Sequence, residues 1–310
     1  MFIKVSTIIP AFNAERTIAN AIDSALRQDY SGQEVVVVND GSTDSTGNIL
    51  ETYRGRVRII TQPNRGSALA RNVGIFQSSG AYIALLDSDD MWLPGKLAKL
   101  VSALDRNPRA SLAFSEFQHV SDTGEESGAS SIGHAPSMEE LLEHVPPILP
   151  STWVVRRTMF EHIGGFGEAF EGAEGFEHCW PLILLRELGE FEYIPETLTL
   201  YRVGDSSASA EKYAPGLPIF IELIKQRYGV RGNTVIRAAK NLECRWLLSK
   251  MAHQMNCGDR LGAVATLGRI ARLRPAYLLS FEFTKRLILR QNLRRVLDLG
   301  GMLGPNRGQK

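Results

Sequence analysis

Short apolar runs alternate with amphipathic stretches along the first two thirds of the chain. Residues 4–9 (KVSTII) and 34–38 (EVVVV) have no helical period and are typical of strands buried on both faces of a sheet. Between them a helix is expected from about Ala14, with Asn13 as its N-cap and apolar residues on one face at Ile18, Ala21, Ile22, Ala25 and Leu26. Further strands at 57–60 and 81–86, also followed by helices, predict βαβ units and an α/β fold with a mostly parallel central sheet.

The pattern changes after residue 120. Residues 121–137 are rich in Ser, Gly and acidic residues, which predicts a surface loop that is either a connector or an active-site lid. A strand at 152–155 and a helix at 176–188 follow. From about Tyr213 the pattern is wholly helical, and helices at 237–255 and 261–272 are expected to form an antiparallel pair.

The charge divides the chain in the same way. The 310 residues have a net charge of +1, but residues 1–210 carry 12 more acidic than basic residues and residues 211–310 carry 13 more basic than acidic ones. This asymmetry predicts two regions, an α/β domain over 1–210 and a basic helical C-terminal region over 211–310.

Several protein classes are excluded by composition. No apolar run approaches the ~18 residues of a membrane-spanning helix, and the N-terminal apolar stretch is too short for a secretory signal. The three cysteines form no CxxC pair, so neither a disulfide framework nor a Cys-based zinc site is indicated, which fits a cytoplasmic protein. The motifs GxGxxG and GxxxxGK[ST] are absent, which removes the main support for a dinucleotide oxidoreductase or a P-loop NTPase.

Polar residues collect where the predicted strands end. Residues 10–13, 39–42 and 87–90 each follow a strand, and ligands of open α/β sheets bind at this edge. Asp87 and Asp89 point the same way in extended backbone, so both carboxylates can face one ligand. Hard cations such as Mg²⁺ or Mn²⁺ prefer one or two carboxylates together with phosphate oxygens. The alternative is an acidic loop that only caps the helix near Pro94.

The chain resembles the family 2 glycosyltransferases, which have the GT-A fold. The resemblance covers residues 3 to about 209 and rests on five ordered blocks: STIIPAFNAERTIANAIDSALRQ, VVVVNDGSTDST, NRGSALARNVGI, GAYIALLDSDDMWLPGKL, and GGFGEAF followed by GFEHCWPLILLRELGEFEYIPETLTLYR. It implies a metal-dependent enzyme that transfers a sugar from a nucleotide diphosphate sugar.

The resemblance implies roles for residues on the donor side. Phe12 matches an aromatic residue that stacks on the base, the alternative being a core Phe. Asp40 matches an acid that accepts a hydrogen bond from the base, a role suiting uracil or thymine, the alternative being a cap for the helix after Ser42. Asp87 and Ser88 would lie near the ribose and phosphates.

Four further positions complete this donor side. Pro10 and Glu15 belong to the nucleotide-facing segment, although Glu15 equally suits the start of a helix. Arg71 would meet the diphosphate or hold the Asp cluster, the alternative being a structural salt bridge. Asp89 of the DxD pattern would bind Mg²⁺ or Mn²⁺.

The acceptor side departs from the family pattern. The family shows Glu-Asp at the start of the late helix, with Asp as general base, whereas this chain has Glu177 and His178 there. His178 is therefore the expected base, oriented by Glu177, whose charge is expected to raise the pKa of the imidazole. The alternative is that His178 only caps the helix and that Glu174, Glu177 or Asp205 is the base. A His that follows the YR segment in the family and helps to hold the metal is missing here, and Asp205 is one candidate to replace it.

The expected function is inverting transfer, with UDP or dTDP favoured, to a hydroxyl of a glycan or lipid-linked glycan in surface polysaccharide assembly. A non-catalytic nucleotide-sugar-binding protein and a nucleotidyltransferase remain alternatives. A basic and aromatic cluster predicts either peripheral contact with the inner face of a membrane or a packed helical appendage: Tyr277, Leu278, Phe281, Phe283, Lys285, Arg286, Arg290, Arg294 and Arg295. The acidic rim argues against nucleic acid as a partner.

Overall fold

The computed structural model of the chain describes residues 4–121, 124–130, 132–143, 148–173, 176–203, 215–256 and 258–279. Its contacts divide the chain into two compact units, Met1–Ser207 with Glu211–Ile236, and Ala208–Ala210 with Arg237–Lys310. The boundary expected from composition at residue 210 stays a prediction.

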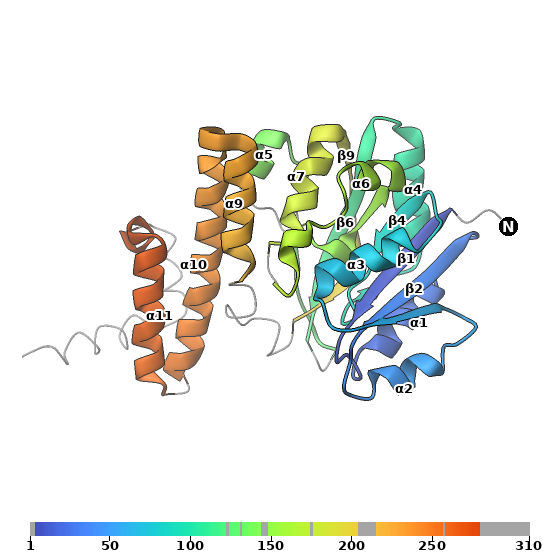
Figure 1. Ribbon diagram of the computed structural model, residues 1–310, viewed down its shortest axis with the longest axis horizontal. Coiled ribbons are helices and arrows are strands. Elements are labelled where there is room, and N and C mark those ends of the chain that lie inside the picture. The colour runs from blue at the N-terminus through green and yellow to red at the C-terminus, as the bar shows by residue number, and fades with distance from the viewer. Residues whose placement is uncertain are drawn as a thin grey trace, which may run out of the picture. The chain divides into compact units, whose positions relative to one another are not determined.

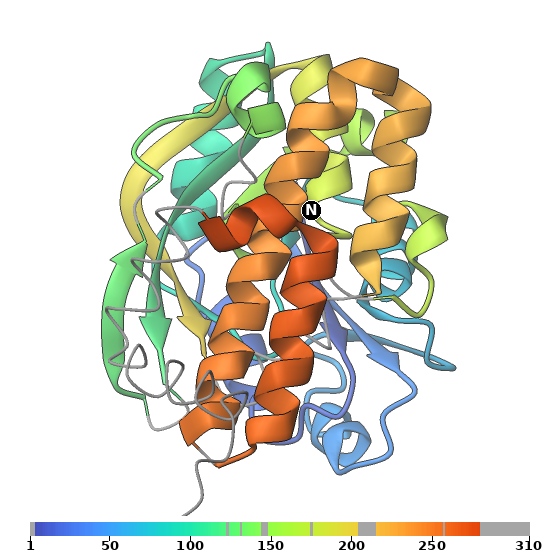
Figure 2. The ribbon, with the colours of Figure 1, turned by 90° about the vertical axis from the view of Figure 1, so that its left-hand side faces the viewer.

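Within the described residues, nine strands form one sheet in the order β3-β2-β1-β4-β8-β6-β9-β5, with β7 paired to β6. The strands are β1 (Val5–Ala11), β2 (Gln33–Asp40), β3 (Arg58–Gln62), β4 (Tyr82–Leu85), β5 (Met91–Trp92), β6 (Ala110–Val120), β7 (Glu126–Ser130), β8 (Trp153–Arg156) and β9 (Glu190–Arg202). Strands β3, β2, β1 and β4 are parallel, as are β6 and β9, whose long pairing is visible in Figure 2. Antiparallel β8 joins these two parts. The predicted α/β class with a parallel core is confirmed.

Helices cover both faces of the sheet in the first unit (Figure 1). The helices of the described chain are α1 (Ile18–Leu26), α2 (Thr46–Glu51), α3 (Ser67–Phe76), α4 (Lys96–Arg106), α5 (Met138–Glu143), α6 (Arg157–His162), α7 (Cys179–Leu188), α9 (Gly216–Tyr228), α10 (Asn233–Asn256) and α11 (Arg260–Leu273). Helices α1 and α4 share a core with Val5 and Ile9 of β1. Helix α3 lies on the opposite face, where a Cβ at Gly74 would come within 2.5 Å of Ile8, so glycine allows the close approach.

Two local expectations are wrong. Helix α1 begins at Ile18 rather than at Ala14, because Asn13 adopts a positive φ of 48° and its Oδ1 accepts a 2.8 Å hydrogen bond from the Thr43 N–H instead of capping the helix. The segment 121–137 is not wholly a loop, because Glu126–Ser130 pairs with β6 as strand β7. Strand β7 forms because its backbone pairs with β6. Its polar sequence has no alternation of apolar residues from which a strand could be predicted.

The second unit contains the predicted helical pair. Helices α10 and α11 pack through a core that includes Cys244, Leu247, Met251 and Ile270. Asp259 caps α11, since its Oδ1 accepts the Gly262 N–H at 2.9 Å. No helix in the described part of the chain has both the length and the apolar character needed to cross a lipid bilayer.

Candidate active site

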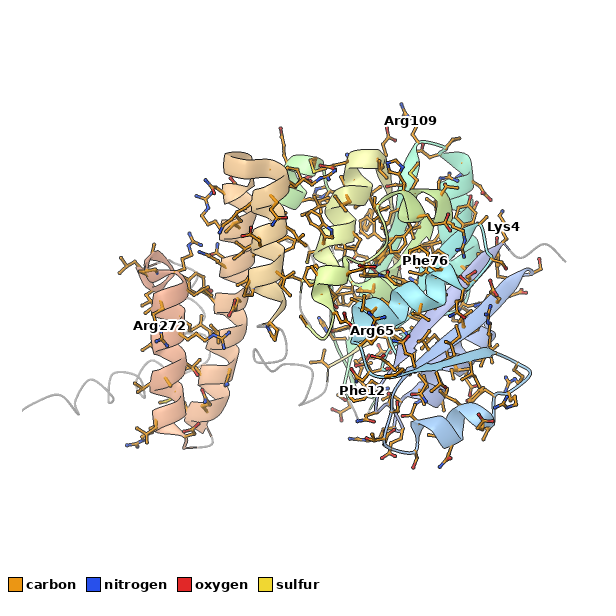
Figure 3. All side chains as sticks on the ribbon, viewed as in Figure 1. Lys4, Phe12, Arg65, Phe76, Arg109 and Arg272 are labelled. Carbon is orange, nitrogen blue, oxygen red and sulfur yellow. The ribbon has the colours of Figure 1, made fainter. Side chains whose placement is uncertain are left out.

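The carboxyl ends of β1, β2 and β4 form one edge of the sheet, because these strands are parallel and adjacent. Phe12 follows β1, Asp40 ends β2, and Asp87 comes shortly after β4. Figure 3 shows Lys4 and Phe12 at opposite ends of β1. Phe12 is 49% exposed, so the core alternative for this ring is wrong and an aromatic face is available at the rim.

The other two residues of this segment have structural partners. Pro10 is buried within β1, where it pairs with Val38. Glu15 accepts a 2.9 Å hydrogen bond from the Ser45 N–H, and its own N–H donates to Asp44. Glu15 therefore connects the segment after β1 to the turn before α2.

Asp40 is a buried carboxylate that holds the turn between β3 and α3. Its Oδ1 accepts hydrogen bonds from Gln62 Nε2 at 2.7 Å and from the Arg65 N–H at 3.0 Å, and its Oδ2 accepts the Gly66 N–H at 2.8 Å. The alternative role as a cap after Ser42 is wrong, because the Ser42 N–H donates to Asn39. Sequence reasoning missed Arg65 and Gly66 as partners, although a glycine directly before a helix signals a tight turn, and Gly66 has a φ of 89°.

The acidic turn after β4 presents carboxylates in different environments. The Asp87 N–H donates to Ser151 Oγ at 3.0 Å, while Ser88 is partly exposed and Asp89 is exposed. Asp90 is fully buried, and its Oδ1 accepts the Arg202 N–H at 3.0 Å. Burial raises the pKa of the Asp90 carboxyl, and the charges of its two acidic neighbours add to the effect.

Arg71 connects the two sides of the candidate site. This arginine of α3 is buried, and its Nη2 lies 2.7 Å from Asp87 Oδ1 while its Nη1 lies 3.4 Å from Glu177 Oε1. Its guanidinium also lies 5.2 Å from the ring centroid of Phe166, and Nη1 donates to Ser67. Arg71 thereby joins the acidic turn to the segment before α7. It contacts one member of the Asp cluster and also forms a structural salt bridge, while its contact with a diphosphate stays a prediction.

Glu177 and His178 form the turn that leads into α7. Glu177 is buried, and within the described part of the chain its Oε2 has no hydrogen-bond partner. Burial lowers the pKa of the His178 imidazole, and Arg71 adds to this effect, while the charges of Glu177 and Asp87 oppose it. The charge of Glu177 raises this pKa as expected, but desolvation outweighs it, so the expectation of a raised pKa for His178 is wrong. Glu174 and Asp205, the alternative bases, lie outside the described residues.

The acidic turn can be compared with the ligands that a divalent cation requires. In the part of the chain that the structure describes, no group of three or more His, Cys, Asp or Glu side chains is arranged to hold a metal ion. Asp89 is nevertheless an exposed carboxylate beside two further acids, which is the oxygen chemistry that Mg²⁺ prefers when phosphate and water supply its other ligands. Sequence reasoning did not assign Arg202, whose Nε donates to the Asp89 carbonyl oxygen at 3.0 Å, or Ser151.

The family model described as "Glycosyl transferase family 2" matches residues 6–164. The matched region contains all of β1 except Val5, together with β2 to β4, the acidic turn and Arg71. The chain belongs to this family. The resemblance to the family is thus confirmed, and the match includes the first four of the five sequence blocks.

Relatives from several bacteria support the assignment. The chain is 31% identical over 225 residues to "Uncharacterized glycosyltransferase EpsJ" of Bacillus subtilis, covering 69% of this chain and 65% of that protein. It is 41% identical over 105 residues to "UDP-Glc:alpha-D-GlcNAc-diphosphoundecaprenol beta-1,3-glucosyltransferase WfgD" of Escherichia coli, covering 33% of this chain and 42% of that protein. These matches span less than two thirds of each relative's length.

A solved structure confirms the GT-A fold. The crystal structure of S. aureus TarS 1–349 in complex with UDP-GlcNAc superposes with a TM-score of 0.63, at 18% identity, covering 87% of this chain and 81% of that chain. Another TarS structure, in complex with UDP, has a TM-score of 0.58 and 19% identity over 75% of this chain and 69% of that chain.

Proposed function

We propose that this family 2 glycosyltransferase moves a sugar from a nucleotide diphosphate sugar to a hydroxyl acceptor with inversion at the anomeric carbon. The observation that carries the proposal is the contact of Arg71 with both Asp87, on the donor side, and Glu177, on the acceptor side. A site with these two halves in contact suits direct transfer between two bound substrates, because catalysis gains from holding the reacting groups together.

The donor is a uridine or thymidine diphosphate sugar in this proposal. Phe12 offers an exposed ring for stacking on the base. Asp40 accepts three hydrogen bonds from described residues, and a carboxylate has roughly four lone-pair sites, which leaves capacity for one N–H of uracil or thymine. The UDP and UDP-GlcNAc complexes of TarS and the UDP-Glc in the name of WfgD favour UDP.

Mg²⁺ or Mn²⁺ is the proposed cofactor, held by Asp89. When bound, the cation neutralises charge that develops on the leaving diphosphate. Ser88 and Asp87 face the ribose and phosphates in this proposal, and Arg71 fixes the Asp87 carboxylate through its 2.7 Å ion pair. Pro10 and Glu15 support the segment that carries Phe12.

His178 is the proposed general base. The acceptor oxygen forms a bond to the anomeric carbon from the face opposite the diphosphate, while the bond between that carbon and the diphosphate oxygen breaks. The acceptor proton passes to an imidazole nitrogen, and the diphosphate leaves as the free nucleotide. A lowered pKa keeps the imidazole neutral at pH 7, as this role requires. Glu177 contacts Arg71 and acts on His178 through its charge, and Glu177 is the alternative base.

The proposed acceptor is a glycan or a lipid-linked glycan in polysaccharide assembly, which agrees with the diphosphoundecaprenol substrate in the name of WfgD.

The proposed location is the cytoplasm, with peripheral contact to the inner face of a membrane through the basic C-terminal helices. Tyr277 does not contribute to such a surface, because it is 1% exposed and belongs to the core of α10 and α11. Residues 281–295 of the predicted basic cluster lie outside the described residues. Co-sedimentation with anionic vesicles, but not with neutral ones, would support the contact, whereas equal partitioning in both, or none in either, would oppose it.

A thermal-shift panel of UDP, GDP, dTDP and CDP, each with and without Mn²⁺, tests the donor and the cofactor. Ligand that binds the folded state raises the melting temperature, so UDP or dTDP should give the largest shift and Mn²⁺ should increase it. Asp89→Ala should remove the Mn²⁺ effect without unfolding the protein, while Glu51→Ala, which removes another exposed carboxylate, should keep it. A wild-type response to Mn²⁺ and UDP in Asp89→Ala would contradict the assignment.

Turnover separates the enzyme from its alternatives. Release of UDP from a UDP-sugar supports transfer, whereas release of pyrophosphate from a nucleoside triphosphate mixed with a sugar 1-phosphate would indicate a nucleotidyltransferase. Nucleotide-sugar binding without release of either, at every pH, would identify a non-catalytic binding protein.

A further inference from the structure

Phe176, directly before Glu177 and His178, has an unusual backbone conformation. Its φ is +65°, and in the described chain the only other residue with a positive φ that is not glycine is Asn13. Asparagine tolerates this left-handed region, whereas a bulky aromatic residue rarely adopts it. Such a conformation persists only where the surrounding structure enforces it, and it often accompanies a functional site.

The ring of Phe176 is held by helix α9. Phe176 and Phe220 are both fully buried and stack with 5.4 Å between ring centroids and 26° between ring planes. The Phe176 carbonyl oxygen also accepts the Cys179 N–H at 3.0 Å, which closes the turn that contains Glu177 and His178. The direction of these two side chains therefore depends on where the Phe176 ring is held.

A second contact fixes the other end of the same helix pair. Arg227 Nε donates to Glu187 Oε2 at 3.1 Å, and the Tyr228 hydroxyl donates to Glu187 Oε1 at 2.6 Å. Helix α9 thus contacts the turn before α7 through Phe220 and the end of α7 through Arg227 and Tyr228. All of these residues lie in the first compact unit and beyond the region matched by the family model.

We propose that α9 is a positioning element of the active site and that Phe220 is its positioning residue, holding Phe176 in the left-handed conformation that directs Glu177 and His178. The role in catalysis rests on the proposed function, in which His178 is the base. The placement of the His178 imidazole by Phe220 does not rest on the proposed function, so this placement can be measured without turnover.

The imidazole itself supplies the first test. The charged groups that face His178 are Glu177 from its own turn, Arg71 from α3 and Asp87 from the acidic turn, and burial is the largest influence on its pKa. Loosening the turn in Phe220→Ala admits water, so the pKa of His178 should rise toward the ordinary value of about 6.5. NMR titration of the histidine ring protons in the full chain measures this, with His178→Gln identifying the resonance.

The matched control is Ile224→Ala. Ile224 lies one turn further along α9 and is also fully buried, but it lies near Gly232 in the η3 turn (Gly229–Gly232). The Ile224→Ala substitution should therefore leave the pKa of His178 unchanged. Should Phe220→Ala not fold, Phe220→Leu keeps apolar volume without the stacking ring and serves in its place. An unchanged titration in the Phe220 variant, or an equal shift in Ile224→Ala, would overturn the proposal.

The second test is the rate of UDP release from UDP-GlcNAc and UDP-Glc with Mn²⁺. Misplacing the base by about 1 Å costs up to about 100-fold, so Phe220→Ala should lower kcat at least about tenfold while the KM for the donor is unchanged. Phe176→Gly should also be slow, although glycine adopts the left-handed conformation without strain, because the stacking ring is lost. Full activity in Phe176→Gly would show that only the backbone turn matters. Absence of release in the wild type would count against the proposed function, and the NMR result would stand separately.

Discussion

Arg71 and Glu177, 106 residues apart in the chain, face each other as a buried ion pair with 3.4 Å between Nη1 and Oε1. The same guanidinium also pairs with Asp87 at 2.7 Å. One buried cation therefore compensates two carboxylates that come from opposite halves of the candidate site.

Arg71→Ala should destabilise the protein and weaken donor binding. Removing one partner of a buried ion pair leaves uncompensated charge and typically costs about 3–5 kcal/mol. Arg71→Lys should be intermediate, because an ammonium keeps the charge but lacks the planar fork that reaches both carboxylates. Urea unfolding and calorimetric titration with UDP and Mn²⁺ measure the two effects.

Arg54→Ala is the control for this series. Arg54 pairs with Glu51 on an exposed surface of the protein, where an ion pair contributes little to stability. An Arg71→Ala variant with the same unfolding midpoint as Arg54→Ala would show that the buried pair does not hold the site together.

Asp40→Asn should reduce both stability and UDP affinity. A carboxamide has a single acceptor oxygen, so it cannot accept from Gln62, Arg65 and Gly66 at once, and each hydrogen bond to a charged group contributes about 1.5–3 kcal/mol. Glu34→Gln is matched to it, since Glu34 lies near the opposite end of β2 and accepts from Ser6 and the Ser79 N–H at 2.7 Å each. Differential scanning calorimetry with and without UDP should show a stability loss in both variants, but a loss of UDP affinity only in Asp40→Asn. Equal affinity in both would remove Asp40 from the donor site.

The sequence predicts the half of the site that follows from strand ends. Residues 35–38 form an uninterrupted apolar run, so Asp40 had to lie at the carboxyl edge of a buried strand, and the same reasoning placed Asp87 and Asp89 beside it. Polar residues at the ends of adjacent parallel strands meet at one edge, whatever the details of packing.

The rest of the candidate site depends on contacts between segments that are distant in the sequence. The periodicity of apolar residues does not predict such contacts. The pairing of Arg71 with Glu177 depends on how α3 and the turn before α7 pack. The direction of the His178 pKa shift depends on burial, which outweighs the adjacent carboxylate that the sequence makes visible. Asn13 had the residue type of a helix cap, but a partner 30 positions away, Thr43, takes its side chain.

Stability should rise with pH over a range that ends at about 10 because of Lys96. This lysine of α4 is fully buried, and its partners among the described residues are neutral oxygens: Thr152 O at 2.9 Å, Thr199 Oγ1 at 3.1 Å and Ser115 Oγ at 3.2 Å. Burial holds its pKa well below the usual value, against a smaller opposing effect of Asp90. Between the folded pKa and about 10.4 the unfolded chain binds more protons, so the free energy of unfolding increases by up to about 1.4 kcal/mol per pH unit.

Urea unfolding at pH 7, 8, 9 and 10 measures this slope. Lys96→Met should remove the contribution of Lys96, whereas Lys99→Met, on the same helix but in an exposed pair with Glu196, should retain it. If the slope survives in Lys96→Met, another group titrates in this range and the lysine is charged in the folded protein.

The choice of general base leads to the prediction that distinguishes this chain from the usual family pattern. His178→Ala should lower the rate of UDP release about 100-fold or more, because a positioned base contributes about 10²–10⁴-fold. Burial lowers the pKa of the imidazole, so the base is neutral over a wider range and the acid limb of the kcat/KM profile should lie below pH 6.5. His178→Asp should restore part of the rate and move the limb to still lower pH, since an unperturbed carboxyl titrates near 3.9. Rates measured across pH 5–9 test both statements, with His162→Ala, at an exposed histidine of α6, as the control. A wild-type rate and profile in His178→Ala would transfer the role to Glu177, whose buried Oε2 has no hydrogen-bond partner among the residues that the structure describes, and Glu177→Gln would then abolish turnover.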